Sequence, residues 1–470
     1  MEETLIEQAD GAPEHSHRHI GVPMLFLGVG FYRAWIEVTY TNPPMEIPAV
    51  AAIGNNLQDV LLGFCLLACA LLAWRLHPLH AKRAVVWAAT FAMCASTVLE
   101  YWSVYRPDLA LPLAIPATVL STVGLSIIIL IWCELYSCLN PLRVALYYSG
   151  GLILGWVICY FLNGLSLDRL LIAATLLPLL STYCAFECSA GFNPLDLPHP
   201  PAKTGALPWK ILIAVAVYTF AFGLFESSAS IYTGPLSSWG MAVGAIVVFA
   251  LATFFADRLR VEGLFRIALP LMILGLLLTA QFTQVFGEFS HFLIDFSYAI
   301  FLIFIMVIMC DYSRRSGVSA IWLFGIERFI RFIVYAGGLN IERLLGSSAT
   351  QPSVVHIVLV IASVALIAFV TVLLLADGNL LAKRVIGANL NDAAADPRAA
   401  RMDRIEALAT AHNLTSREKE VFDLLLEDKS IAEIERELYI SNGTVRAHIQ
   451  HIYRKCGIHS RQELVELVDE

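Results

Sequence analysis

The chain has 470 residues, of which 58% are hydrophobic and only 15% are charged. A soluble domain is typically about 45–50% apolar and about 25% charged, so this composition excludes an ordinary soluble multidomain protein. The net charge of −8 does not by itself indicate that the chain binds nucleic acid. The charge is, however, unevenly distributed along the sequence.

The ten cysteines predict neither a disulfide framework nor a metal centre. Most of them lie in apolar segments, where cysteine acts as a small hydrophobic side chain. No pair has the Cys-x-x-Cys spacing of a zinc site, and no cofactor is expected. We interpret His15, His17 and His19 as a solvated tail within residues 1–19, with metal binding as the alternative.

Twelve apolar segments predict membrane-spanning helices, because each approaches the roughly 20 residues that cross a bilayer. They cover residues 20–41, 50–75, 84–105, 110–135, 142–163, 167–188, 209–232, 238–256, 264–286, 290–312, 318–340 and 353–376. A proline-rich linker, 189–208, follows the sixth segment. The sequence therefore predicts two six-helix halves, 20–188 and 209–376.

The basic residues between these segments indicate the orientation of the chain. Lysine and arginine collect in short cytoplasmic loops. With the N-terminus inside, the inner loops and tail hold twelve Lys and Arg residues, and the outer loops hold only Arg106, Arg169 and Arg343. We therefore expect a multi-pass protein of the cytoplasmic (inner) membrane with both termini in the cytoplasm.

Six plus six spans with a long central linker resemble the major facilitator superfamily. The segment Ala256-Asp257-Arg258-Leu259-Arg260 is similar to an Asp-Arg loop signature of that family, and the matching loop of the first half lacks it. The resemblance implies an all-α, polytopic helical bundle whose two halves surround a site near the bilayer midplane.

The sequence changes character after the last apolar segment. Residues 377–413 are polar and alanine-rich, and Met402, Ile405 and Leu408 share one face of a short helix. That helix is either packed within the linker or a coupling or dimerising element. Residues 414–470 predict four short helices, because capping boxes begin at Thr415, Ser430 and Ser460, and Ser441 is a further N-cap.

Residues 414–470 closely resemble the LuxR-type (GerE-like) helix-turn-helix domain. The matching residues are Leu414-Thr415-x-Arg417-Glu418-x-Glu420-Val421, Ile434, Leu438, Ile440-Ser441, Thr444-Val445-Arg446-x-His448, Ile452-Tyr453, Lys455, Gly457-Ile458 and Ser460-Arg461. The resemblance implies that the third helix of this four-helix domain reads the major groove of DNA and that the domain acts as a homodimer on DNA.

The base-reading positions of the family fall on Arg446, Ala447 and Gln450, and its phosphate contacts fall on Thr444, Arg454 and Lys455. The chemistry agrees, because arginine can read guanine, glutamine can read adenine, and alanine can contact a thymine methyl group. The domain as a whole is acidic, but no acid occurs between Glu437 and Glu463, and that stretch holds Arg446, Arg454, Lys455 and Arg461. We therefore expect weak, salt-sensitive binding by one domain alone.

Ionisable and aromatic residues within the apolar segments are candidates for ligand contact. The candidates are Arg33, Glu37, Tyr40, Tyr218, Phe222, Glu226, Asp295, Tyr298, Glu327 and Arg331. The pairs Arg33/Glu37 and Glu327/Arg331 can instead be intrahelical ion pairs that neutralise each other. The Tyr218/Phe222 stripe can equally be core.

A membrane bundle with candidate ligand contacts and a DNA-binding domain occur in one chain. Together they predict a membrane-embedded, one-component transcriptional regulator that senses a small molecule. The resemblance to membrane-bound regulators of this design implies a small aromatic inducer. No catalytic motif is present, so the sequence does not predict an enzyme. Two alternatives stay open. One is a secondary transporter, or dual transporter and sensor, with a regulatory C-terminal domain. The other is a membrane scaffold whose helical module binds protein.

Overall fold

The computed structural model describes residues 22–41, 46–53, 55–192, 197–198, 204–205, 207–229, 239–254, 261–344, 354–376, 408, 412, 414–426, 429–438, 440–458 and 463–464. The chain divides into two compact units, Met1–Asn391 and Asp392–Glu470. The expected N-terminal tail, most of the 377–413 linker and the cap at Ser460 lie outside the described residues. All regular structure in the described residues is helical, as the all-α prediction requires.

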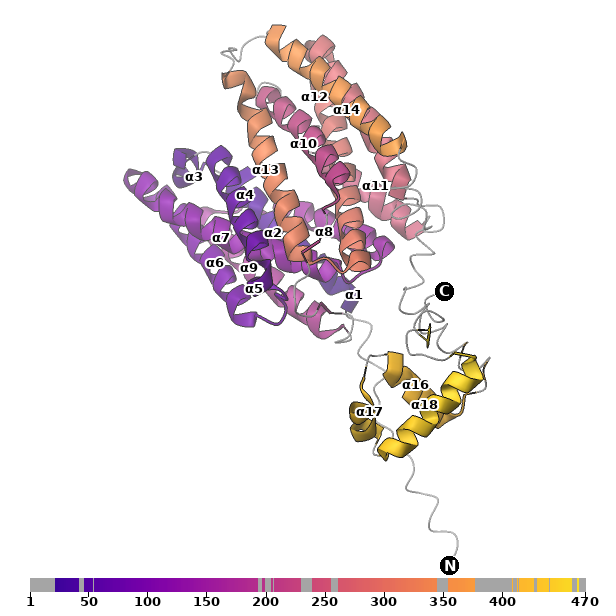
Figure 1. Ribbon diagram of the computed structural model, residues 1–470. Helices are drawn as coiled ribbons and strands as arrows, with labels where there is room; N and C mark the ends of the chain where they lie inside the picture. Colours follow the sequence, from indigo (N-terminus) through magenta and orange to yellow (C-terminus); the bar gives the residue numbers. More distant parts are fainter. Residues whose placement is uncertain are drawn as a thin grey trace, which may run out of the picture. The chain divides into compact units, whose positions relative to one another are not determined.

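The larger unit, Met1–Asn391, is called the membrane unit below. The described residues of its first half form nine α-helices, drawn from indigo to magenta in Figure 1. They are α1 (Val22–Leu25), α2 (Val29–Ile36), α3 (Pro48–Ile53), α4 (Asn55–Leu71), α5 (Ala73–Leu76), α6 (Arg83–Tyr105), α7 (Ala110–Tyr136), α8 (Pro141–Leu162) and α9 (Leu167–Ala190). Short 3-10 turns, η1 (Phe26–Gly28) and η3 (Pro107–Leu109), and a π-helical turn, η2 (Glu37–Thr41), accompany them. The first predicted span is therefore divided into several short helical segments.

The second half contains α10 (Trp209–Ala229), α11 (Gly240–Phe254), α12 (Val261–Ser316), α13 (Ala320–Leu344) and α14 (Val354–Ala376). Helix α12 covers both the ninth and the tenth predicted spans. Two contacts show that α12 folds back on itself. Ser297 Oγ donates to the carbonyl of Ala268, and Gly275 lies against Ile294. The chain therefore reverses between Gly275 and Ser290, and two antiparallel arms stand where two spans were predicted.

Six helical segments in the described part of the chain are long and apolar enough to cross a membrane. They are Arg83–Tyr105, Pro107–Tyr136, Pro141–Leu162, Leu167–Ala190, Trp209–Glu226 and Gly287–Ser316. Four shorter apolar helical segments accompany them: Leu57–Leu71, Gly240–Phe254, Ile267–Leu278 and Val358–Val370. These lengths and compositions suggest a membrane protein.

Glycines allow the helices within each half to approach backbone to backbone. A Cβ atom placed on Gly30 of α2 would lie 2.5 Å from the carbonyl oxygen of Gly151 of α8. In the second half, a Cβ atom on Gly338 of α13 would lie 2.5 Å from the carbonyl oxygen of Phe220 of α10. Small residues at such crossings permit the close packing that helices use in membranes.

The C-terminal unit contains α16 (Ser416–Leu426), α17 (Ile431–Leu438) and α18 (Asn442–Cys456), drawn in yellow in Figure 1. Their apolar faces enclose a separate small core around Val421, Phe422, Ile434 and Ile452. Of the predicted fourth helix, Glu463 and Leu464 are described as helical, and Leu464 is completely buried in this core. Leu408 packs against the same core, ahead of the predicted start of the domain.

Candidate functional sites: a recognition helix and a charged membrane interface

Helix α18 begins at a side-chain cap and ends at a glycine. The hydroxyl of Ser441 accepts a hydrogen bond from the backbone N–H of Thr444 at 3.2 Å. Gly457 closes the helix in the left-handed conformation, with φ of 70°. Both ends are therefore fixed by local chemistry, as expected for a serine N-cap and a glycine beyond the last turn.

One face of α18 is packed and the opposite face is open. Val445 and Ile452 are completely buried. Arg446, Ala447 and Gln450 are exposed. The two sets alternate at helical spacing, so burial of the apolar face turns the polar side chains outward.

Five of the six candidate DNA contacts are exposed: Thr444, Arg446, Ala447, Gln450 and Arg454. The sixth, Lys455, is partly buried and its Nζ atom lies 2.7 Å from Oε2 of Glu418. A lysine held in this way is less free to reach a phosphate than Arg454.

Glu418 connects the first helix of the domain to α18. Its carboxylate accepts the backbone N–H of Thr415 at 2.8 Å, which completes the predicted capping box, and it also pairs with Lys455. His451 of α18 lies 3.6 Å from the other carboxylate oxygen. The hydrogen bond from Lys455 lowers the pKa of Glu418 to about 2.

A second contact between helices was not expected from the sequence. The carboxylate of Glu435 in α17 accepts a hydrogen bond of 3.1 Å from the side chain of Asn442. Glu435 therefore links α17 to the start of α18.

In the membrane unit the two halves contact each other in two places. In the first, Gly325 of α13 lies against Leu66 and Ala70 of α4. In the second, the ring centroids of Trp156 in α8 and Trp239 lie 4.5 Å apart, and Phe249 of α11 packs on Gly150. The candidate ligand contacts are described next.

Arg33 and Glu37 form an intrahelical ion pair of 3.8 Å, and both side chains keep some accessible surface. Glu37 also interacts electrostatically with Glu226 of α10 and Asp295 of α12. These carboxylates belong to different halves. Glu37, Glu226 and Asp295 therefore lie within electrostatic range of one another across the interface between the halves, and Arg33 pairs with Glu37.

Tyr40 is not part of this group. It lies in the π-helical turn, is buried, and donates its hydroxyl to Glu100 of α6. Its ring packs edge-on against Trp35, whose indole N–H bonds to Thr97 at 2.8 Å. Tyr40 thus belongs to the packing of the first half.

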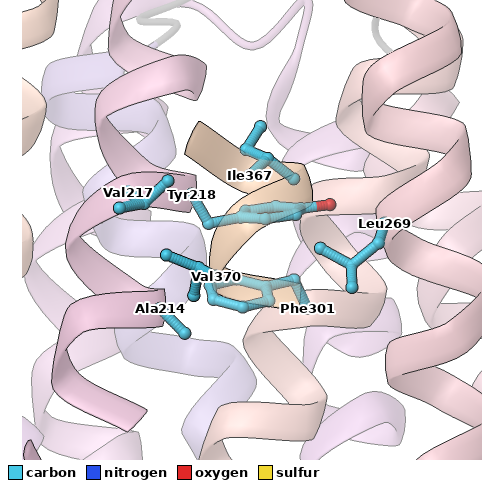
Figure 2. A pocket seen from close by; sticks show the side chains of 7 residues that line it. All are labelled: Ala214, Val217, Tyr218, Leu269, Phe301, Ile367 and Val370. Atoms are coloured by element: carbon cyan, nitrogen blue, oxygen red, sulfur yellow. The ribbon is translucent and has the colours of Figure 1, made fainter. Parts of the chain in front are cut away.

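Tyr218 lines a small pocket inside the second half, between α10, α12 and α14 (Figure 2). The cavity volume is only about 10 Å³, roughly the room for one water molecule, and the walls are otherwise apolar. Figure 2 shows the ring of Tyr218 stacked on that of Phe301. The ring centroids lie 3.9 Å apart, and the Tyr218 hydroxyl bonds to Ser297. This site is too small for most drug-sized ligands, which occupy roughly 300–1,000 Å³.

Phe222 and Tyr298 form a stacked pair with ring centroids 3.8 Å apart. Tyr298 interacts electrostatically with Arg328 and Arg331 of α13. This stack joins α10 to α12 and lies within electrostatic range of the charged residues of α13.

Glu327, Arg328 and Arg331 form a buried charged cluster on α13. Glu327 is completely buried, and the arginines are 8% and 7% exposed. Arg331 Nε donates to Glu327 at 2.8 Å, so the predicted pair is present. Arg328 Nε lies 3.6 Å from the other carboxylate oxygen. Arg328 lies within electrostatic range of Tyr32, Cys133 and Tyr148 of the first half. The candidate set included none of these four residues.

A further buried carboxylate, Glu134 of α7, holds a loop. It accepts the backbone N–H groups of Leu79 at 2.8 Å and His80 at 3.1 Å, and lies 3.2 Å from His77. In the part of the chain that the structure describes, no group of three His, Cys, Asp or Glu residues could hold a metal ion.

Comparison with known proteins defines the class of the C-terminal domain. The model of the family "Bacterial regulatory proteins, luxR family" (GerE) matches residues 412–468. The spore germination protein GerE of Bacillus subtilis (strain 168) is 52% identical over 56 residues, which are 12% of this chain and 76% of that protein. The chain belongs to the LuxR family of bacterial regulatory proteins.

A second relative shares only the same domain. The transcriptional regulatory protein DesR of Bacillus subtilis (strain 168) is 44% identical over 55 residues, or 12% of this chain and 28% of that protein. The C-terminal unit is therefore a LuxR-type helix-turn-helix domain, which supports transcription regulation by DNA binding.

The membrane unit resembles a solved transporter in fold. The crystal structure of the human organic anion transporter MFSD10 (TETRAN) aligns with a TM-score of 0.50 and 14% sequence identity. The alignment covers 74% of this chain and 98% of that one. The expected major-facilitator-like helical bundle is therefore the fold of this unit.

Proposed function

We propose that the chain is a membrane-embedded, one-component transcriptional regulator. A small molecule binds between the two halves of the membrane unit and favours one arrangement of them. The change passes along residues 377–413 to the DNA-binding domain. The observation that carries the proposal is the presence of a transporter-like bundle and a LuxR-type domain in one chain.

The proposed DNA contacts follow from the exposed face of α18. Arg446, Ala447 and Gln450 read bases in the major groove, and Thr444 and Arg454 contact phosphates. Lys455 serves mainly to hold α18 against α16 through Glu418. Two domains bind as a homodimer, because one small acidic domain offers few phosphate contacts.

The proposal places the protein in the cytoplasmic membrane with twelve spans and both termini in the cytoplasm. The uneven distribution of lysine and arginine supports this orientation. It also puts the DNA-binding domain on the side of the bilayer where DNA is found.

The test is genome-wide DNA occupancy in cells that express the full chain or Arg446→Ala. We expect discrete peaks for the wild type and their loss in the variant. Arg417→Ala, which removes an arginine from α16, is the matched control and should keep the peaks. Peaks that survive Arg446→Ala would contradict base reading by α18.

The fold of the membrane unit supports a second candidate, a transporter that carries a regulatory domain. Its relative in the structural comparison is an organic anion transporter. This candidate requires uptake that persists when residues 414–470 are deleted. Loss of uptake in Glu37→Gln or Glu226→Gln would then identify the carboxylates that couple transport to protons.

A further inference from the structure

We propose that the ligand of the membrane unit is an organic acid whose carboxylate binds beside Arg328. The inference deepens the proposed sensing function and rests on it. It follows from the charge balance of the Glu327–Arg328–Arg331 cluster and from the groups that surround it.

The cluster carries one more positive than negative charge. Guanidinium groups remain protonated in proteins, so one carboxylate faces two fixed positive charges. Arg331 has the closer contact with Glu327, at 2.8 Å. Arg328 reaches the same carboxylate only at 3.6 Å, which is beyond hydrogen-bonding distance. Among the described residues, Glu327 is the only acid that pairs with Arg328.

The surplus positive charge of this cluster lowers the stability of the protein, because the cluster is buried. Arg328 is 8% exposed and shares its one carboxylate partner with Arg331, and buried charges need full pairing to offset the loss of hydration. Such residues in membrane helices usually face an interior site and find a partner there. A ligand carboxylate would supply the missing charge and can accept two parallel hydrogen bonds from one guanidinium.

Two tyrosines near Arg328 suit a carboxylate. Tyr32 and Tyr148 of the first half lie within electrostatic range of Arg328, and a tyrosine hydroxyl can donate a hydrogen bond to an anion. Arg33 lies close enough to interact with Arg328, but its own charge is matched by Glu37. An anion at Arg328 would therefore touch both halves and could bias their arrangement.

A separate acidic part of the interface helps to orient the ligand. Glu37, Glu226 and Asp295 interact with one another across the halves. They would repel a carboxylate and accept hydrogen bonds from polar groups at the other end of a ligand. The acid group is thereby directed to Arg328.

The test compares three probes of one shape on the purified full chain in detergent. They are 3-phenylpropionate, its uncharged amide 3-phenylpropionamide, and the cation 2-phenylethylammonium. Binding is followed by calorimetry and by the shift in melting temperature. We expect the carboxylate to bind and raise the melting temperature, and the amide and the amine to do neither.

Variants of the cluster should change carboxylate binding in opposite directions. Arg328→Gln removes the surplus charge and should weaken binding about tenfold or more, the effect of losing a charged hydrogen bond. Glu327→Gln increases the surplus and should strengthen binding. Arg328→Lys keeps the charge and should retain part of the affinity. Arg75→Gln, an arginine that stacks on Trp74, is the control and should change nothing.

Folding and binding can be separated in this design. Arg328→Gln leaves the Glu327–Arg331 pair intact, so its melting temperature without probe should be at least that of the wild type. Equal binding of the amide, preference for the amine, no binding of any probe, or unchanged carboxylate binding in Arg328→Gln would each overturn the organic-acid proposal.

Failure of the proposed function would give a different result. Carboxylate binding without any DNA peaks in cells would contradict the regulator and leave the anion site in place. Peaks that respond only to uncharged compounds would contradict the anion site and leave the regulator in place.

Discussion

Lys455 of α18 lies with its Nζ atom 2.7 Å from Oε2 of Glu418, the residue that caps α16. One carboxylate thus closes the capping box of the first helix and holds the end of α18. The orientation of α18 therefore depends on a residue that is distant in the sequence from the proposed base-reading positions.

Glu418→Gln should destabilise the domain and alter its acid sensitivity. Glutamine can still complete the capping box, so the substitution removes mainly the charge. At neutral pH we expect the free energy of unfolding of a 392–470 fragment to fall by about 1–3 kcal/mol, the usual contribution of a hydrogen bond to a charged group. Urea unfolding of the two fragments measures this difference.

The pH dependence of that difference has a defined sign. The pKa of Glu418 falls from an ordinary 4.5 to about 2 in the folded domain, so its contribution is complete above pH 4.5. It is lost as the pH falls through about 2, and the difference between wild type and Glu418→Gln should shrink over that range. Glu420→Gln, at an exposed pair with Arg417, is the control. A difference that does not change with pH would contradict the role of the Glu418 charge.

Ser441→Ala should loosen the start of α18. Its hydroxyl accepts the N–H of Thr444, and loss of an N-cap typically costs about 1 kcal/mol. Ser441→Asp keeps an acceptor and should restore most of the stability in urea unfolding. If the alanine and aspartate variants are equally destabilised, the cap is not the cause.

Arg446→Ala and Arg454→Ala should weaken DNA binding in different ways. Loss of a base contact at Arg446 should cost about 1–3 kcal/mol on the preferred sequence and reduce discrimination at one base pair. Loss of a phosphate contact at Arg454 should weaken binding on all sequences and lower the salt slope by about one. Titrations of fluorescent duplexes at several salt concentrations separate the two effects. An identical response of both variants would contradict these assignments.

Two adjacent glycines of α13 offer a matched test of packing. A Cβ atom on Gly338 would lie 2.5 Å from the carbonyl oxygen of Phe220, whereas one on Gly337 would meet nothing within 4 Å. We expect Gly338→Ala to lower the melting temperature of the detergent-solubilised chain. Gly337→Ala should leave it unchanged or raise it slightly, because alanine favours a helix by about 1 kcal/mol over glycine. Equal melting temperatures in both variants would contradict the contact.

Features that depend on neighbouring residues could be predicted from the sequence. The capping box at Thr415 and the cap at Ser441 are present because their partners lie three residues away. The α-helical fold of the membrane unit also follows from long apolar segments, whose backbone groups must bond within the segment.

Features that depend on the rotation of a helix could not be predicted in this way. Tyr40 was placed on the face of Arg33 and Glu37 by regular helical spacing, but the π-helical turn at Glu37–Thr41 changes that spacing. Arg328 lies within electrostatic range of first-half residues because α13 packs against α4. The bond between Glu435 and Asn442 likewise depends on how α17 meets α18.

The glycine contacts within the two halves also limit how fast the membrane unit can respond. Where Gly30 lies on Gly151 and Gly338 lies on Phe220, the contact is between backbones, and no side chain can rotate to relieve a displacement. Each half should therefore move as one body. Rotations of whole bodies take microseconds to milliseconds, whereas exposed side chains move in picoseconds to nanoseconds. Brief fluctuations in ligand occupancy would then be averaged before they change the arrangement of the halves.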